Sequence, residues 1–308
     1  MADYAPIVLF VYKRLELTIQ AIESLKKNNL AKHSHLYIFS NAPTSPADEA
    51  QVGAVRKYIA SIDGFAHVTV IRATENRGAA VAIISGISKI FEQYDRIIVV
   101  EDDLILTPNF LDYMNAALDF YAKKKVFSVS GYGLALRFDR NDKADVYYLP
   151  RNCSWGWGTW KDRWATVDWD VSDYDTFKND KAAQKAFNYS GGDMSRMLDF
   201  QMEGKIDAYD IRFSYAQYKS GLPTVYPKIS KVENNGFGPG ATHTVNNPNF
   251  KVIMDDSNKT TFKFSDTLEI DPRILRQFVY HFSIPRKIKN RLRNYARAVG
   301  KKFSYPVL

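Results

Sequence analysis

The feature that most constrains this chain is an apolar run that ends in three acidic residues. Four β-branched residues at positions 97–100 are followed directly by Glu101, Asp102 and Asp103. A continuous apolar run of this kind is typical of a central strand in a parallel sheet, which helices cover on both faces. In open α/β sheets, ligands bind just beyond the carboxyl ends of such strands. We therefore expect the three acids to lie where a ligand would bind.

Three neighbouring carboxylates repel one another unless a cation holds them together. Mg²⁺ and Mn²⁺ prefer oxygen ligands, and they often keep water and phosphate oxygens as further ligands. The alternative is an acidic turn that only caps the next helix. The position of the triplet at the end of a buried strand favours a metal–phosphate site. The next helix is expected to begin at Thr107 and Pro108, with Thr107 as its N-cap.

Apolar periodicity predicts strands alternating with helices over residues 1–131. The expected strands are 7–12, 36–39, 67–71, 97–100 and 126–131, and the expected helices are 15–27, 47–62, 79–94 and 110–122. This alternation is typical of βαβ crossovers and of a mostly parallel sheet. Gly78 opens the third helix without the G-x-G-x-x-G pattern, so a dinucleotide-binding oxidoreductase is not favoured.

Composition excludes several classes of protein. With 308 residues, of which 45% are hydrophobic, the chain can form a substantial core. The only cysteine, Cys153, cannot form an intramolecular disulfide, which fits a reducing compartment. The apolar run near the N-terminus is too short for a signal peptide or a membrane span, and no stretch approaches about 18 apolar residues. We expect a chain that does not cross a membrane.

A tryptophan-rich segment follows the first half of the chain. Trp155, Trp157, Trp160 and Trp164 lie close together and are interspersed with glycines. Glycines let backbone and ring faces approach a ligand, and indole rings are good platforms for sugars and bases. Trp155 and Trp157 are the two expected to face a ligand. The alternative is an aromatic cluster that only packs this loop onto the sheet.

Two further candidates lie later in the chain. Asp210 falls at the start of an expected helix, where the helix dipole favours a carboxylate, although simple helix capping is an equal alternative. Residues 234–243 form a loop with three glycines that ends in His243. Such a loop can close over a bound phosphate and bring His243 to a metal ion. A loop histidine that is only solvated is the alternative.

Together these motifs resemble the GT-A-fold, nucleotide-sugar-dependent glycosyltransferases of the family 2 kind, which occur in bacterial surface-polysaccharide clusters. The matching motifs are Tyr12-Lys13-Arg14, Asn76-Arg77-Gly78, Val99-Val100-Glu101-Asp102-Asp103-Leu104 and Ser154-Trp155-Gly156-Trp157. The acidic triplet and the Pro-Asn-Phe start of the next helix are also similar to the Golgi N-acetylglucosaminyltransferase that begins complex N-glycans. The resemblance covers residues 5–245, and it is specific for the fold rather than for the sugar.

The resemblance implies a role for each site residue. Asp103 would contact the metal ion, Mn²⁺ or Mg²⁺, with His243 as a second candidate ligand. The expected donor-binding residues are Tyr12, Arg14, Asn41, Arg77, Gly78, Glu101, Asp102 and Trp157, and the expected acceptor-binding residues are Trp155 and Tyr209. Asn41 stands where the Golgi enzyme has an aspartate that reads uracil, so the identity of the base stays open.

The resemblance also implies an inverting reaction that needs a carboxylate base at the start of a late helix. Asp210 is the best counterpart, although its partner Asp207 is not adjacent as the family pattern requires, and Asp193 is the runner-up. The implied reaction moves a sugar from a nucleoside-diphosphate donor, a UDP-sugar first of all, to a glycan or lipid-linked glycan acceptor. The implied context is synthesis of surface polysaccharide, such as lipopolysaccharide or capsule.

Positive charge is concentrated at the C-terminal end. Residues 273–308 hold ten Lys and Arg and no Asp or Glu, so the rest of the chain has a net charge of −2. In residues 284–303, apolar side chains recur at three- and four-residue steps among basic ones. This pattern predicts a basic amphipathic helix that docks on an anionic membrane surface. Packing against the catalytic domain and nucleic-acid contact are the alternatives.

We therefore expect an α/β protein of the GT-A type, Rossmann-like, with a mostly parallel central sheet flanked by helices. The catalytic domain would be 1–271, with a nucleotide-sugar-binding half at 1–131 and an acceptor-binding half at 132–271. Residues 272–308 would form a basic helical tail. The expected location is cytoplasmic and peripheral on the inner leaflet of the bacterial cell membrane. Nucleic acid is not an expected partner, because an acidic cleft repels its phosphates.

Two other functions stay open. A sugar nucleotidyltransferase also uses an α/β sheet and carboxylate-bound Mg²⁺, but it would carry a glycine-rich loop after the first strand, and residues 11–15 contain no glycine. A non-catalytic carbohydrate-binding protein would use the tryptophans but would leave the acidic triplet without a purpose.

Overall fold

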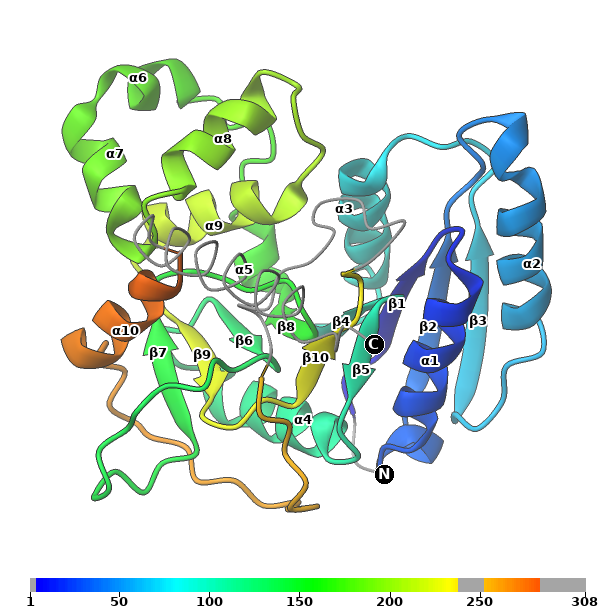
Figure 1. Cartoon of the computed structure of the whole chain (residues 1–308), viewed down its shortest axis with the longest axis horizontal. Helices are drawn as coiled ribbons and strands as arrows, with labels where there is room; N and C mark the ends of the chain where they lie inside the picture. The colour runs from blue at the N-terminus through cyan, green and yellow to red at the C-terminus, as the bar shows by residue number, and fades with distance from the viewer. Residues whose placement is uncertain (1–3, 238–251, 283–308) are drawn as a thin grey trace, which may run out of the picture.

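The computed structural model describes residues 4–237 and 252–282 and contains one large sheet covered by helices (Figure 1). The strands are β1 (Ile7–Val11), β2 (His35–Ser40), β3 (His67–Arg72), β4 (Arg96–Glu101), β5 (Leu104–Leu106), β6 (Ser128–Ser130), β7 (Val146–Leu149), β8 (Trp157–Trp160), β9 (Thr224–Pro227) and β10 (Val232–Asn234). The helices are α1 (Leu15–Lys26), α2 (Glu49–Ile59), α3 (Ala79–Ile90), α4 (Phe110–Tyr121), α5 (Lys161–Ala165), α6 (Tyr174–Asn179), α7 (Lys181–Phe187), α8 (Met194–Met202), α9 (Tyr209–Ser220) and α10 (Pro272–Phe282). Short 3-10 turns are η1 (Ala31–His33), η2 (Pro46–Asp48) and η3 (Asn188–Ser190).

The main sheet confirms the predicted α/β architecture. Its strand order is β3-β2-β1-β4-β8-β6-β9-β7, and a separate small sheet pairs β10 with β5. The first four strands are mutually parallel, as are β6 and β9. Strand β8 runs antiparallel between β4 and β6, and β7 is antiparallel to β9. The parallel strands therefore bring the carboxyl ends of β1, β2, β3 and β4 to one edge.

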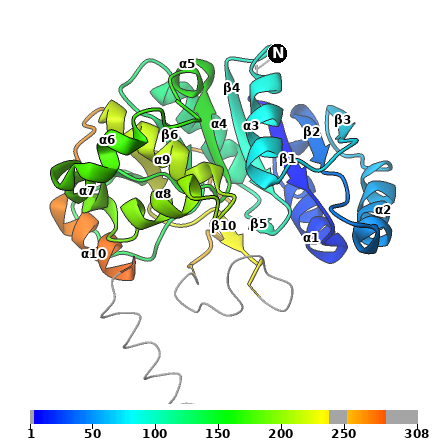
Figure 2. The same cartoon turned by 90° about the horizontal axis from the view of Figure 1, so that it is seen from above.

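The central strands are buried on both faces, as the apolar run predicts. Along β4, Ile98 and Val100 join the core cluster that contains α1 and α4, whereas Ile97 and Val99 join the cluster that contains α3 and α9. This division follows from the alternation of side chains along a strand. Figure 2 shows α1 and α3 on opposite sides of β1, and α6 to α9 grouped over the other half of the sheet.

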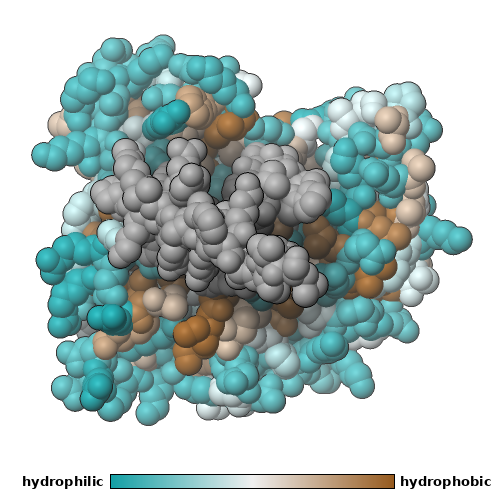
Figure 3. Space-filling model, viewed as in Figure 1, coloured by the Kyte–Doolittle hydropathy of each residue, from teal (hydrophilic) through white to brown (hydrophobic). Residues whose placement is uncertain are grey.

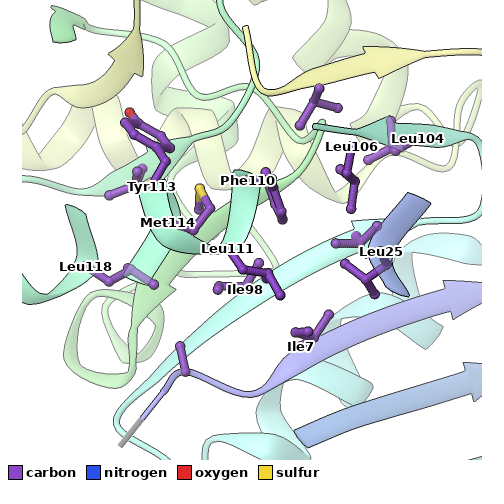
Figure 4. Close-up of a cluster of buried hydrophobic side chains, with 14 of the residues drawn as sticks. Ile7, Leu25, Ile98, Leu104, Leu106, Phe110, Leu111, Tyr113, Met114 and Leu118 are labelled. Carbon is purple, nitrogen blue, oxygen red and sulfur yellow. The ribbon is translucent and has the colours of Figure 1, made fainter. Parts of the chain in front are cut away.

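The first core cluster fixes the position of α4 against the sheet. Phe110, Leu111 and Met114 of α4 are fully buried with Ile98 of β4 and Leu25 of α1 (Figure 4). Burying an aliphatic or aromatic side chain of this size stabilises a fold by about 1.5–3 kcal/mol. The acidic turn between β4 and β5 is therefore anchored by apolar packing on both sides of it.

The predicted N-cap at Thr107 is wrong, although the expected helix 110–122 agrees with α4. Residues 104–106 form β5, and α4 begins only at Phe110. Pairing with β10 holds this segment extended, and the backbone N–H of Thr107 donates to the carbonyl of Lys231 at 2.9 Å. The Thr107 hydroxyl donates to Asn109 instead of capping a helix. A long-range strand pair therefore overrides the local capping signal.

The C-terminal described segment wraps back onto the sheet. In α10, Ile274, Leu275 and Phe278 are buried against Leu149 and Tyr226. The predicted basic helix at 284–303 lies outside the described residues. Within 4–237 and 252–282, no helix is long and apolar enough to cross a membrane. The face seen in Figure 3 is mostly hydrophilic at its outline, and hydrophobic side chains show mainly toward the middle of the view.

A buried ion pair joins this wrapping segment to the strand beside the acidic turn. Lys231 and Asp255 are both about 95% buried and form a salt bridge. Burial alone would raise the pKa of Asp255, but hydrogen bonds from Lys231, Ser257 and Asn109 hold it well below its ordinary value of 3.8. The unfolded chain therefore binds a proton at a higher pH than the folded chain. Asp255 stabilises the fold above about pH 4, and this contribution is lost as the pH falls through its folded pKa.

We predict that Asp255→Asn lowers the free energy of unfolding at pH 7 by about 3–5 kcal/mol, because Lys231 is left buried without its counter-charge. Urea unfolding followed by circular dichroism measures this loss. The variant should also lose less stability than the parent chain between about pH 4 and pH 2. An unchanged unfolding free energy at pH 7 would contradict a structural role for the pair.

Candidate functional site

The acidic triplet lies at the carboxyl edge of the sheet, as predicted. Glu101 is the last residue of β4, and Asp102 and Asp103 form the turn into β5. Strand β10 brings its own end over this turn, where the N–H of Asn235 donates to the carbonyl of Asp103 at 2.7 Å. Gly236 is so close that a Cβ atom there would lie 2.3 Å from Asp103 Oδ2. A side chain at position 236 would therefore push into the Asp103 carboxylate.

One basic side chain faces two of the three acids. Arg14 stands just before α1, and its Nη2 donates to Asp102 Oδ1 and, at 3.0 Å, to Asp103 Oδ2. The other oxygen of Asp102, Oδ2, is buried and has no hydrogen-bond partner among the described residues. An unpaired buried carboxylate oxygen is costly, so this corner can accept a further donor or a cation.

The pKa values of two of the acids are raised, because these carboxyl groups are buried next to other negative charges. Burial, followed by the charges of Asp103, Asp102 and Asp210, raises the pKa of Glu101 well above its ordinary value of 4.5. Burial also raises the pKa of Asp102 to about 6, although Arg14 works in the opposite direction. Arg14 therefore compensates the charge of the triplet only in part.

The structure brings Asp210 into the same cluster. Asp210 lies in the first turn of α9, and its charge contributes to the raised pKa of Glu101. Its charge also acts on the Cys153 thiol, whose pKa is raised to about 12 mainly by burial. The start of α9 lies near the end of β4, because the Tyr209 hydroxyl accepts from Trp157 Nε1 and Trp157 pairs with Val99, two residues before Glu101. Asp193, the runner-up, is held by Arg151 through two hydrogen bonds of 2.9 and 3.2 Å.

The loops after β1, β2 and β3 are tied together beside the acids. The Tyr12 hydroxyl contacts Thr44 and donates to Asp48 at 3.1 Å. Asn41 donates to the side-chain oxygen of Asn76 at 3.3 Å, and that oxygen also accepts from the N–H of Gly78 at 2.9 Å. The predicted donor-binding residues Tyr12, Asn41 and Gly78 therefore lie in one connected group of loops.

Asp207, expected only as the partner of Asp210, has a structural role that sequence reasoning missed. Its Oδ2 accepts hydrogen bonds from the N–H groups of Ala79 at 2.6 Å and Ala80 at 3.3 Å, at the start of α3. Gly78, with φ of +89°, leaves room for it, since a Cβ there would lie 2.6 Å from the same oxygen. The carboxylate is thus an N-terminal cap supplied from a residue far along the chain. The neighbouring Arg77 is exposed and forms a salt bridge with Glu75.

Two aromatic predictions are wrong. Trp157 was expected to face the donor and Tyr209 the acceptor, but Trp157 is 0% exposed and Tyr209 is 5% exposed. Trp157 Nε1 donates to the Tyr209 hydroxyl at 3.1 Å, and the rings pack with Phe213 in the core. Trp157 lies in β8 at the centre of the sheet, which explains its burial. Trp155, only partly buried, packs edge-on against Tyr132 and Phe237.

The carboxylate oxygens at this turn are suitable ligands for a hard divalent cation, although Arg14 also contacts two of the carboxylates. Within residues 4–237 and 252–282, no group of three or more His, Cys, Asp or Glu side chains is already arranged around one point. His243 lies outside the described residues. Asp103 and the unpaired Oδ2 of Asp102 are nevertheless oxygen ligands of the kind that Mg²⁺ and Mn²⁺ prefer. The close approach of Gly236 leaves the Asp103 carboxylate without a side chain against it on that side.

Comparison with known proteins gives only a weak likeness in structure. No protein-family model and no curated protein matches the chain. Mannosyltransferase PcManGT from Pyrobaculum calidifontis, solved in complex with GDP-Man and Mn²⁺, is similar with a TM-score of 0.35 and 14% identity, over 51% of this chain and 45% of that one. TarS from S. aureus is similar with a TM-score of 0.41 and 9% identity, over 76% of this chain and 61% of that one. The chain therefore spans less than two thirds of the length of either protein.

We predict that Asp207→Ala lowers the free energy of unfolding by about 1 kcal/mol, because the first N–H groups of α3 lose their acceptor. Asp207→Asn should retain most of the stability, since its side-chain oxygen can still accept. Chemical unfolding of both variants beside Asp256→Ala, an exposed aspartate elsewhere, measures the difference. Equal stability of Asp207→Ala and Asp256→Ala would show that the cap contributes nothing.

Proposed function

We propose that this protein is a metal-dependent, inverting glycosyltransferase of the GT-A type. It would move a sugar from a nucleoside-diphosphate donor, with UDP-sugars the first to test, to a glycan or lipid-linked glycan. One geometric observation carries the proposal: Asp210 lies in the first turn of α9 next to Tyr209, whose hydroxyl accepts from Trp157, and Trp157 pairs with Val99 just before the acidic triplet. A donor-holding acidic corner and a carboxylate base are the two parts that inverting transfer needs.

The N-terminal half would bind the donor. Tyr12, Asn41 and Gly78 border the nucleoside in this proposal, and Arg14 and Arg77 supply cationic donors for phosphate oxygens. Asp103, with Asp102 beside it, would hold Mn²⁺ or Mg²⁺. A bound divalent ion supplies the positive charge that offsets negative charge gathering on the departing diphosphate.

The C-terminal half, residues 132–271, would bind the acceptor. Asp210 accepts the proton of the acceptor hydroxyl in this proposal, and that hydroxyl then attacks the anomeric carbon on the face opposite the diphosphate. Asp210 lies in the first turn of α9, next to Tyr209, which is hydrogen-bonded to Trp157 in the core. This packing fixes the position of the Asp210 backbone. The partly exposed Trp155 remains the aromatic candidate for contact with the acceptor.

The role of the basic tail stays part of the proposal. Charge distribution supports docking of residues 284–303 on an anionic inner leaflet, where lipid-linked acceptors would be found. Liposome flotation with anionic vesicles, compared between the full chain and a variant that lacks residues 284–308, tests this docking. Undiminished binding to anionic vesicles would remove the idea.

We predict that Asp210→Asn lowers the transfer rate by about 10²–10⁴, because the acceptor hydroxyl loses its proton acceptor. Donor binding should persist, because Asp210 contacts only the acceptor in this account. The donor is first identified by a hydrolysis screen of nucleotide-sugars with Mn²⁺, and transfer is then assayed with donor binding measured by calorimetry. Asp193→Asn is the matched variant, and a larger loss there than in Asp210→Asn would reverse the assignment.

We predict that Asp103→Ala abolishes the Mn²⁺-dependent part of nucleoside-diphosphate binding. Calorimetry with UDP in the presence and absence of Mn²⁺ separates this part from metal-independent binding. Asp119→Ala, an aspartate on the far end of α4, serves as the control and should bind as the parent chain does. Equal Mn²⁺ dependence in Asp103→Ala and the parent chain would contradict the metal role of Asp103.

A further inference from the structure

A cavity lies at the C-terminal end of α9, the helix that carries Asp210 in its first turn. This cavity, of about 170 Å³, opens between η3, the C-terminal end of α9 and the segment that follows β7. Its walls are mainly aromatic and apolar, and they include Pro150, Phe187, Tyr189, Tyr218, Leu222 and Ile270. Pockets for drug-sized ligands usually measure about 300–1,000 Å³, so this cavity suits a single ring.

The cavity is lined by one buried side-chain amide, that of Gln217, whose oxygen lacks a hydrogen-bond donor among the described residues. Gln217 lines the cavity and is 1% exposed. Its Nε2 donates to the carbonyls of Leu222 at 3.1 Å and Leu149 at 3.4 Å, which fixes the orientation of the amide. Its Oε1 is buried and has no partner among the described residues. A ligand that donates a hydrogen bond, such as a hydroxyl, would satisfy this oxygen, and a purely aliphatic ligand would not.

The lining points to a neutral ligand with one apolar face. Among the described residues that line the cavity, none carries a charged side chain. Tyr189 is 61% exposed at the rim, and Tyr218 packs against Phe187 with ring centroids 5.3 Å apart. Sugar rings combine a face of C–H groups, which packs on aromatic rings, with hydroxyls that donate hydrogen bonds. A neutral sugar ring therefore matches both the walls and the unpaired amide oxygen.

Every described residue that lines the cavity belongs to the proposed acceptor-binding half, 132–271. Gln217 follows Asp210 by seven residues in α9, which corresponds to about 10 Å along the helix. A short glycan could thus extend from the reacting hydroxyl near Asp210 to the cavity.

We propose that this cavity binds one neutral sugar ring of the acceptor, remote from the ring that is glycosylated. The assignment of that ring to an acceptor rests on the proposed function, whereas the binding of a sugar ring does not. The cavity would select acceptors that are already longer than one sugar and would place them along α9.

Saturation-transfer NMR with a panel of methyl glycosides, including those of glucose, galactose, mannose and N-acetylglucosamine, tests the cavity without any donor. Ala186 is exposed at the cavity wall, so Ala186→Trp should fill the entrance. Ala182, also exposed and one turn earlier in α7, does not line the cavity, and Ala182→Trp is the matched control. Tyr189→Ala is a second variant, because its exposed ring can be removed without opening the core.

At least one methyl glycoside should bind the parent chain and Ala182→Trp equally, and Ala186→Trp should weaken that binding by about tenfold or more. Tyr189→Ala should weaken it in the same direction, and it decides the question if Ala186→Trp does not fold. Absence of binding by every glycoside, equal binding in all variants, or preferential binding of uridine would overturn the proposal. A chain that binds a glycoside here but hydrolyses no nucleotide-sugar would contradict the proposed transfer and leave the cavity assignment standing.

Discussion

Repulsion among carboxylates at the end of β4 is the constraint on which the rest of the structure depends. Burial and mutual charge raise the pKa of Glu101 and Asp102, so the fold spends stability to keep these acids together. Arg14 donates hydrogen bonds to only two of the three acids, Asp102 and Asp103, and one Asp102 oxygen stays buried without a partner among the described residues. An arrangement that costs stability and is only half compensated is typical of a binding site rather than of a scaffold.

Apolar packing and strand pairing around the turn hold the three acids in place despite their repulsion. The two core clusters enclose β4 from both faces, and β10 pairs with β5 directly after the turn. The buried pair of Lys231 and Asp255 ties the base of β10 to the segment that wraps the molecule. Asp207 joins the start of α3 to the segment before α9. The donor-side loops and the carboxylate of Asp210 are therefore held by the same framework.

Local sequence patterns predicted the elements but not the contacts between distant segments. The apolar run at 97–100 predicted a doubly covered strand, because a strand buried on both faces is apolar at every position and does not alternate. The capping signal at Thr107 failed, because pairing with β10, more than a hundred residues later, held that segment extended. Trp157 looked like a ligand platform, since nothing local shows that its strand inserts between β4 and β6. The contact of Asp207 with α3 and the closeness of Gly236 to Asp103 also depend on tertiary structure alone.

The most direct test is to locate the cation. Crystals grown with UDP and Mn²⁺ and measured at the manganese absorption edge would show the ion by its anomalous scattering. The account predicts a peak about 2.0–2.2 Å from a carboxylate oxygen of Asp103 and next to the diphosphate, with the Arg14 guanidinium drawn away from at least one acid. A bound diphosphate with no anomalous peak at this turn, and with Arg14 still paired to Asp102 and Asp103, would contradict it.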